Sequence, residues 1–274
     1  MKVDAHHHLW QPLRGDHDWM PDGHPILDRQ YRPADMAPHL AAHGIDRTVL
    51  VQAAATLHET EYMLGLADAT DWIGGVVGWI DFEDADQRQQ LERLARHPKF
   101  KGVRPMIQDI ADDDWMLRAD VAWAFDAVAD LDLCFDALGF PHHLPNFHTV
   151  LTRHPMRAVI DHCMKPDVAG GAFDAWAGGM TRLAQDTEAC VKLSGLVTEA
   201  TEDWTPDDLR PYAEHALSAF GPDRVMWGSD WPVCRLRAEY GDWHDTARDL
   251  CADLSPADQA RVFGGTAARF YRLE

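Results

Sequence analysis

The chain opens on a short motif that could bind a metal ion or polarise a carbonyl group, Asp4-Ala5-His6-His7-His8. Side chains of a β-strand alternate between its two faces, so Asp4, His6 and His8 are expected to share one face. Two imidazoles two residues apart on a strand can aim at one small volume. Three histidines between apolar residues are too few for a purification tag. We therefore interpret them as part of a site.

Further polar side chains stand at the ends of apolar runs downstream. They are Gln52, Arg104, Asp136, His162, Lys165, Lys192, Ser194 and Asp230. Each has an ordinary structural alternative: Asp230 could cap a helix, Arg104 could pair with a surface carboxylate, and His162 could be a core histidine. Asp136 could orient a neighbouring histidine, as carboxylates behind metal ligands do. Their joint occurrence at strand ends favours one shared site.

Apolar runs that alternate with helical patterns must position these residues. The predicted strands are the N-terminal histidine segment and residues 48–53, 75–81, 101–106, 133–138, 157–162, 190–195 and 224–230. The predicted helices are 33–41, 59–70, 84–97, 118–131, 143–153, 173–185, 205–220 and one that begins at Ser255. Eight such units predict an α/β fold of the (β/α)8 TIM-barrel type, in which catalytic side chains lie at the C-terminal ends of the strands.

A doubly wound open sheet is the alternative architecture, but no glycine-rich phosphate-binding motif follows any predicted strand. No linker or low-complexity tract divides the chain, so residues 1–274 are expected to form one domain. Residues 11–32 are irregular and rich in Pro and Gly. A loop of this length is usually functional, and we interpret it as a cover over one mouth of the fold.

The formal net charge of −20 argues against nucleic acid and anionic membranes as partners. The five cysteines have no C-x-x-C spacing, which is typical of a reduced, cytoplasmic protein. No signal peptide and no membrane-spanning segment are expected. No exposed apolar stripe indicates an oligomeric state.

Four motifs in order resemble the amidohydrolase superfamily, and within it the sugar-lactonase branch. They are DAHHHLW at 4–10, GVRP at 102–105, IDH at 160–162 followed by KP, and WGSDWP at 227–232. The resemblance implies a (β/α)8 barrel that hydrolyses the lactone of an aldonic acid. It also implies His6, His8, His162 and Asp230 as the core of the site.

Two-metal members of that superfamily carry a bridging lysine or glutamate on strand four and a histidine on strand five. Here Lys101 and Arg104 are three positions apart and so face opposite ways, and Asp136 stands near the strand-five position. A two-metal site is therefore not expected. One divalent ion, zinc, is the candidate cofactor, with His6, His8, His162 and Asp230 as ligands, and activity without a metal stays open as the alternative.

Lactone hydrolysis needs an activated water, a stabilised oxyanion and a proton for the leaving alkoxide. Asp230 is the predicted general base. The three histidines would polarise the carbonyl, directly or through a metal. Arg104 would stabilise the oxyanion or bind the product carboxylate. The predicted substrate-binding residues are Trp10, His24, Trp79, Lys165 and Trp231.

Other functions compete with a sugar lactonase. A metal-dependent decarboxylase of an aromatic acid would belong to the same superfamily, and a hydrolase of another cyclic ester or amide would use the same groups. A binding module that kept only the barrel is a third alternative, although the predicted base and polarising groups are all present.

Overall fold

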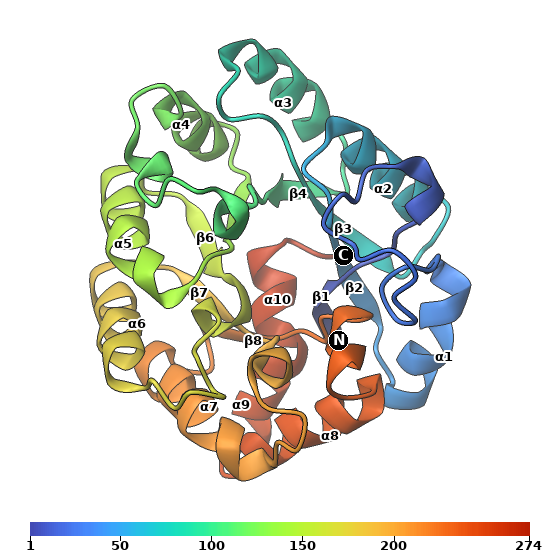
Figure 1. The fold of residues 1–274 in the computed structure, drawn as a ribbon, viewed down its shortest axis with the longest axis vertical. Coiled ribbons are helices and arrows are strands. Elements are labelled where there is room, and N and C mark those ends of the chain that lie inside the picture. Colours follow the sequence, from blue (N-terminus) through green and yellow to red (C-terminus); the bar gives the residue numbers. More distant parts are fainter.

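Eight parallel strands form one sheet in the order in which they occur along the chain, in a computed structural model that describes residues 1–274 (Figure 1). The strands are β1 (Val3–His7), β2 (Arg47–Val51), β3 (Ile73–Gly78), β4 (Phe100–Val103), β5 (Cys134–Ala137), β6 (Arg157–Ile160), β7 (Cys190–Leu193) and β8 (Val225–Trp227). This arrangement confirms the predicted TIM barrel, and the open-sheet alternative is wrong.

An outer ring of helices surrounds the strands, and the last helix, α10 (Thr266–Phe270), lies at the centre of the view in Figure 1. The helices are α1 (Pro33–His43), α2 (Leu57–Asp68), α3 (Arg88–Ala95), α4 (Ala122–Asp130), α5 (Leu144–Arg153), α6 (Asp174–Asp186), α7 (Pro206–Phe220), α8 (Tyr240–Leu250), α9 (Pro256–Ala260) and α10 (Thr266–Phe270). The sequence prediction missed α8, whose first turn contains Gly241, a poor helix former. The helix predicted from Ser255 is instead divided into α9 and α10 by an irregular turn.

Two helices begin at the capping residues that the sequence predicts. At α7, the carboxylate of Asp208 accepts hydrogen bonds from the backbone N–H and the hydroxyl of Thr205, with Pro206 in the first helical position. At α9, the hydroxyl of Ser255 accepts a hydrogen bond from the backbone N–H of Asp258. These caps satisfy backbone donors that have no partner inside the helix.

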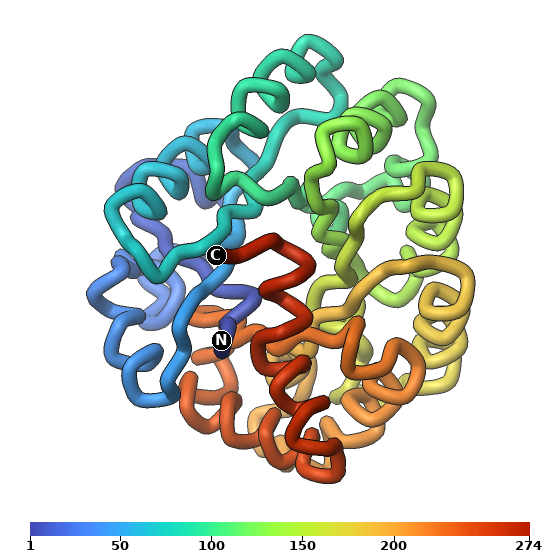
Figure 2. Tube along the Cα trace, turned by 180° about the vertical axis from the view of Figure 1, so that it is seen from behind, coloured from blue at the N-terminus to red at the C-terminus, as the bar shows by residue number.

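The barrel closes between its first and last strands. The backbone N–H of His8 donates to the carbonyl of Trp231 at 2.7 Å, and that of Asp230 donates to the carbonyl of His6 at 2.8 Å. The end of the barrel at which the strands begin is covered by α10, which crosses the centre of the molecule in the rear view of Figure 2. Phe270 and Tyr271 pack there against inward-facing strand residues such as Val3.

One expectation for the first strand is wrong. The pairing of β1 with β2 shifts register between Asp4 and His7, so strict alternation fails there. Asp4 therefore does not share the face of His6 and His8. Its carboxylate accepts hydrogen bonds from the backbone N–H of Ser229 and from the hydroxyl of Tyr240 on α8.

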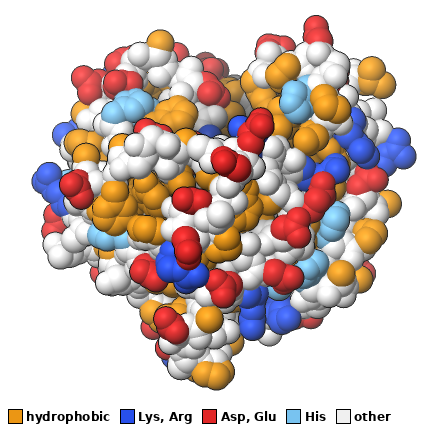
Figure 3. All heavy atoms as spheres, turned by 60° about the horizontal axis from the view of Figure 1, so that its bottom comes forward, with side chains coloured by type: hydrophobic (Ala, Val, Ile, Leu, Met, Phe, Trp, Pro, Cys, Tyr) orange, Lys and Arg blue, Asp and Glu red, His pale blue; other side chains and the backbone are white.

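The surface agrees with the acidic composition. In the space-filling view of Figure 3, acidic side chains are scattered over the face, with lysine and arginine in smaller groups among them. No helix combines the length and the apolar character needed to cross a bilayer.

The irregular segment 11–32 is attached to the barrel by a buried glutamate at the start of α2. Glu59 accepts hydrogen bonds from the backbone N–H groups of Ala53 at 3.0 Å and Ala54 at 2.5 Å, and lies 3.1 Å from Nε2 of His17. Trp19 of the same segment donates its indole N–H to the carbonyl of Ala53. Glu59 thus joins the cover segment to the loop that follows β2.

We expect Glu59→Ala to lower the free energy of unfolding by about 2–5 kcal/mol, because it leaves two buried backbone donors without an acceptor. Urea denaturation followed by circular dichroism measures this change. Glu61→Ala on the same helix removes only an exposed ion pair with Arg93 and should change stability by less than about 1 kcal/mol. Equal effects of the two substitutions would contradict the anchoring role of Glu59.

Candidate active site

A cavity of about 200 Å³ lies at the C-terminal ends of the strands. Its lining residues come from several strand ends and from the cover segment. They are His8, Trp19, Ala53, Arg104, Met106, Gln108, Asp109, Leu138, His162, Lys165, Thr198, Asp230 and Val233. A larger cavity of about 660 Å³ is lined by Ala129, Arg157, Ala189 and Phe270 among others, and contains none of the predicted site residues. The smaller cavity is therefore the candidate active site.

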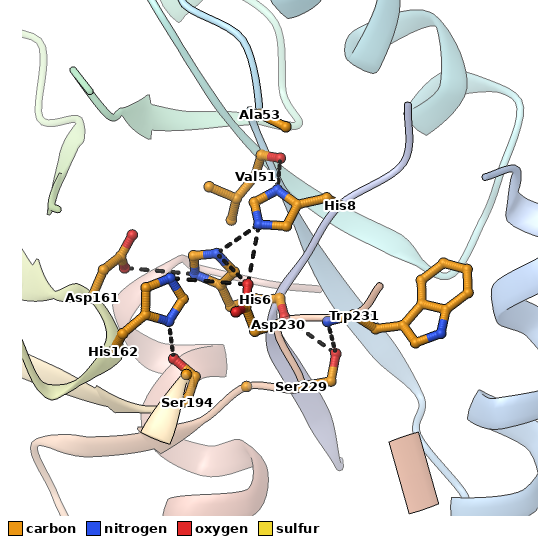
Figure 4. Close-up of polar contacts among 12 residues, drawn as sticks. His6, His8, Val51, Ala53, Asp161, His162, Ser194, Ser229, Asp230 and Trp231 are labelled. Carbon is orange, nitrogen blue, oxygen red and sulfur yellow. Dashed lines mark hydrogen bonds and ion pairs between the residues drawn. The ribbon is translucent and has the colours of Figure 1, made fainter. Parts of the chain in front are cut away.

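The imidazoles and the carboxylate predicted from the sequence converge at the floor of this cavity (Figure 4). Nε2 of His6 lies 3.2 Å from Nε2 of His8, and Oδ1 of Asp230 lies 3.3 Å from Nε2 of His8. The same oxygen lies 3.7 Å from Nε2 of His6 and 3.9 Å from Nε2 of His162. Four side chains at or just after the C-terminal ends of β1, β6 and β8 thus share one small volume.

The backbone at two of these residues adopts a conformation that side chains rarely tolerate. His162 and Asp230 have φ angles of 52° and 56°. The left-handed region costs about 1–2 kcal/mol for a residue with a Cβ atom. Gly195 allows the His162 ring to approach closely, since a Cβ atom there would lie 2.6 Å from that ring. Strain of this kind is typical of functional positions.

Burial and neighbouring charges determine the protonation of this cluster. Burial lowers the pKa of His162 to about 4. Burial raises the pKa of Asp230, but His162, His8 and Lys165 together lower it by more, so the net pKa lies below its ordinary value. At neutral pH, Asp230 is therefore an anion that can accept a proton, and His162 is a neutral imidazole.

Arg104 extends from the end of β4 to the same floor. Its guanidinium lies 3.1 Å from Oδ2 of Asp161 and 3.4 Å from Nε2 of His6, and it donates to the carbonyl of Gln52. The alternative of a surface ion pair is wrong, because Arg104 is only 3% exposed. Its cationic group is placed where negative charge could be stabilised.

A second layer of buried charges lies beneath His6, and the sequence analysis missed one member of it. Lys192 lies 2.6 Å from Oδ2 of Asp136 and 2.9 Å from Oδ1 of Asp161, and all three side chains are fully buried. Asp161 was not singled out, although its position directly before His162 at a strand end could have identified it. Asp136 was noted only as a possible orienting carboxylate, and it contacts Lys192 rather than a histidine.

The predicted substrate-binding residues divide into two groups. Lys165 lines the cavity, 3.9 Å from Glu199. The other four residues do not line it: they are Trp10, His24, Trp79 and Trp231. Trp10 is fully buried and donates to the carbonyls of Leu27 and Arg29, and the ring of Trp231 points away from the imidazoles in Figure 4. Trp10 and Trp231 are buried and pack the fold, which is what large buried side chains do most often.

Sequence reasoning also missed an aromatic residue that does line the cavity. Trp19 is 41% exposed and belongs to the cover segment. Its place in a long loop gave no spacing signal, since loops have no periodicity that predicts where a side chain points. Trp19 supports the predicted role of residues 11–32 as a cover at this mouth of the barrel.

The donor atoms at the floor fit one divalent ion. Ligand atoms around a tetrahedral zinc ion lie about 3.3 Å apart, and those of His6, His8 and Asp230 are separated by 3.2–3.7 Å. Nδ1 of His8 lies 2.8 Å from the carbonyl of Val51, so Nε2 of that ring offers a lone pair toward Asp230. Nε2 of His8 and Oδ1 of Asp230 are then two acceptors 3.3 Å apart, and such a pair can share a cation or a hydrogen.

Imidazoles and a carboxylate at the C-terminal end of a (β/α)8 barrel define a site of hydrolytic type. A model of the Amidohydro_2 family, described as amidohydrolase, matches residues 3–273, and the chain belongs to this family. It is 43% identical over 280 residues to an L-fucono-1,5-lactonase of Burkholderia ambifaria, across 100% of this chain and 96% of that protein. It is 36% identical to an L-fucono-1,5-lactonase of Burkholderia multivorans, with the same coverage.

Solved structures give the same result. A crystal structure of an amidohydrolase from Burkholderia multivorans with bound zinc superposes with a TM-score of 0.93, at 36% identity and full coverage of both chains. A second crystal form of an amidohydrolase from that species, with bound HEPES, has a TM-score of 0.94 at 34% identity, again over both full chains. The resemblance to the amidohydrolases is thereby confirmed, as is the prediction of a lactone-opening hydrolase.

We expect one zinc ion per chain to bind at the floor of the cavity, and His8→Asn to weaken that binding at least tenfold, because a ligand with fixed orientation is lost. Isothermal titration of chelator-treated protein with zinc sulfate measures stoichiometry and affinity. His24→Asn serves as the control, since His24 lies outside the cavity lining. Equal zinc affinities in the two variants would show that these donors do not form the ion site.

Proposed function

We propose that this protein hydrolyses L-fucono-1,5-lactone or a closely related lactone of a six-carbon aldonic acid. The observation that carries the proposal is the convergence of Asp230 with His6, His8 and His162 at the floor of one cavity. The full-length similarity to two L-fucono-1,5-lactonases supports the choice of substrate. A decarboxylase of an aromatic acid has no such support among these full-length relatives.

Asp230 acts as the general base in the proposed reaction. Its lowered pKa keeps the carboxylate ionised at neutral pH. A water molecule held against Oδ1 transfers a proton to that oxygen as its own oxygen attacks the lactone carbonyl carbon. The imidazoles of His8 and His162 orient this water, because both lie within 4 Å of the same carboxylate oxygen.

Cationic and N–H groups opposite the base stabilise the oxyanion that forms. The guanidinium of Arg104 is held by Asp161 and faces the floor of the cavity beside His6. When the tetrahedral intermediate collapses, the bond to the ring oxygen breaks and that oxygen takes the proton from Asp230. The products are a hydroxyl group and a carboxylic acid, which loses its proton to solvent.

A divalent ion, which we propose to be zinc, would be held by His6, His8 and Asp230, with His162 beside them. When bound, it would polarise the carbonyl group as a Lewis acid. At the rim, Lys165 is the candidate partner for substrate hydroxyls or the new carboxylate, since its ammonium is partly exposed and lies 5.4 Å above the ring of Phe140.

We further propose that residues 1–274 act as one catalytic domain in the cytoplasm. The five free and buried cysteines support a reducing compartment, because none of them forms a disulfide. The acidic surface supports a small neutral substrate over a polyanion.

A panel of sugar lactones tests the function directly. We expect a pH-stat assay to detect acid release from L-fucono-1,5-lactone well above its spontaneous hydrolysis, with weaker turnover of lactones that differ at one hydroxyl. Ultraviolet absorbance assays with aromatic acids should detect no decarboxylation. Turnover of an aromatic acid without turnover of any sugar lactone would overturn the proposal.

Asp230→Asn should lower kcat/KM for the lactone by about 10²–10⁴-fold, since an amide cannot take the proton from water. Initial rates across a range of lactone concentrations measure the loss. Asp130→Asn, at an exposed ion pair on α4, is the matched control and should retain activity. If Asp230→Asn kept near-normal turnover while folding normally, a different group would have to be the base.

A further inference from the structure

A fully buried lysine lies beneath the candidate site, and the reaction described above does not use it. Lys192 stands near the end of β7. Its ammonium lies 2.6 Å from Oδ2 of Asp136, 2.9 Å from Oδ1 of Asp161 and 3.0 Å from Nδ1 of His6. A lysine ammonium has three hydrogens and no lone pair. Two of these contacts are hydrogen bonds, to Asp136 and to Nδ1 of His6, and the contact with Asp161 is an ion pair.

The contact between Lys192 and His6 determines where the imidazole carries its hydrogen. Because the ammonium can only donate, Nδ1 of His6 must be the acceptor. A neutral imidazole with an accepting Nδ1 carries its hydrogen on Nε2. Arg104, which like Lys192 can only donate, lies 3.4 Å from Nε2, and the carboxylates of Asp161 and Asp230 lie 3.6 Å and 3.7 Å from the ring nitrogens. The shorter contact, from Lys192 to Nδ1 at 3.0 Å, determines the tautomer, and the two cations together oppose a doubly protonated ring.

The neighbouring histidine has the complementary arrangement. Nδ1 of His8 lies 2.8 Å from the carbonyl oxygen of Val51, which can only accept, so His8 carries its hydrogen on Nδ1. Its Nε2 is then an acceptor, 3.2 Å from the Nε2–H of His6. The two tautomers are mutually consistent, and the hydrogen on His6 points toward the centre of the site.

We propose that Lys192 is a positioning residue that holds His6 in the Nε2–H tautomer. In this state, with no metal ion on Nε2, His6 donates a hydrogen bond to the reacting carbonyl. This catalytic role rests on the proposed lactone hydrolysis. The tautomer itself does not depend on that reaction.

The same contact sets how readily the floor of the site accepts a divalent cation. An ion bound to Nε2 of His6 needs a lone pair on that atom, and the hydrogen must then move to Nδ1, where the ammonium of Lys192 stands. The ammonium also repels a second cation nearby. Lys192 therefore competes with a metal ion for His6, as an internal cation built into the barrel.

A purely structural role would be the alternative, in which Lys192 only neutralises Asp136 and Asp161. Removal of the ammonium alone would leave the buried carboxylate of Asp136 without a counter-ion and Asp161 with Arg104 alone, and Lys192→Met by itself is expected to unfold or weaken the protein. The double variant Lys192→Met/Asp136→Asn removes one positive and one negative charge, so the charge balance of the cluster is kept. This variant separates the positioning role from charge neutralisation.

The control is Tyr271→Phe. Its hydroxyl donates to Oδ2 of Asp136 at 2.8 Å, on the side of the cluster away from the cavity. This substitution removes one hydrogen bond from the same buried network and keeps the ammonium of Lys192. It reports how far a general loosening of the network affects the measurements.

Two readouts need no substrate. Nitrogen-15 NMR of histidine-labelled protein reports which ring nitrogen of His6 is protonated, with the signals assigned by their loss in His6→Gln. We expect an unprotonated Nδ1 in the wild type and in Tyr271→Phe. In the double variant we expect a protonated Nδ1, which can donate to Oδ1 of Asp161, 3.6 Å away. Titration with zinc sulfate should show at least tenfold tighter binding to the double variant than to the other two proteins.

A third readout links the tautomer to catalysis. With L-fucono-1,5-lactone, kcat of the double variant should fall at least tenfold while KM changes less than threefold, since the lost donor acts on the oxyanion. An unchanged His6 tautomer, or zinc affinity within twofold of the wild type in a folded double variant, would overturn the role of Lys192. Absence of lactone turnover in the wild type would instead refute the proposed function and leave the NMR and zinc measurements as the test of Lys192.

Discussion

The closure of the barrel between β1 and β8 is the constraint on which the site depends. Two backbone hydrogen bonds, from His8 to Trp231 and from Asp230 to His6, join segments more than 220 residues apart. These bonds fix the spacing between the imidazoles of β1 and the carboxylate after β8. The geometry needed for proton transfer is therefore set by the sheet itself, which is more rigid than a loop.

Burial of charge is the second constraint, and it couples the floor of the cavity to the core. Asp136, Asp161, Lys192 and Arg104 lie at or near zero exposure. Such groups are tolerated only when each charge has a close partner. The distances of 2.6–3.1 Å among them meet that requirement. The same ion pairs and hydrogen bonds hold His6 and Arg104 in place. The contacts that allow these charges to be buried therefore also position the groups of the site.

Much of this arrangement could be predicted from the sequence, and the failures have physical causes. His6, His8, His162, Arg104 and Asp230 were identified because strand ends at one edge of a barrel must meet. Periodicity carried no information about the register shift near Asp4, since such a shift arises from pairing between strands. Trp10 and Trp231, which were expected to bind substrate, do not line the cavity, because the sequence does not reveal whether a large ring faces a cavity or the core.

The charge distribution suits a reaction that converts a neutral ester into an anion. The chain carries a net charge of −20, which does not oppose the approach of a neutral lactone. Within the cavity, Arg104 and Lys165 offer local positive charge, which in the proposed reaction stabilises the oxyanion and then binds the carboxylate. Once the product has left these two cations, the acidic surface repels it. In the proposed reaction, the positive groups of the site thus stabilise the oxyanion, and the negative charge of the whole protein favours release of the carboxylate product.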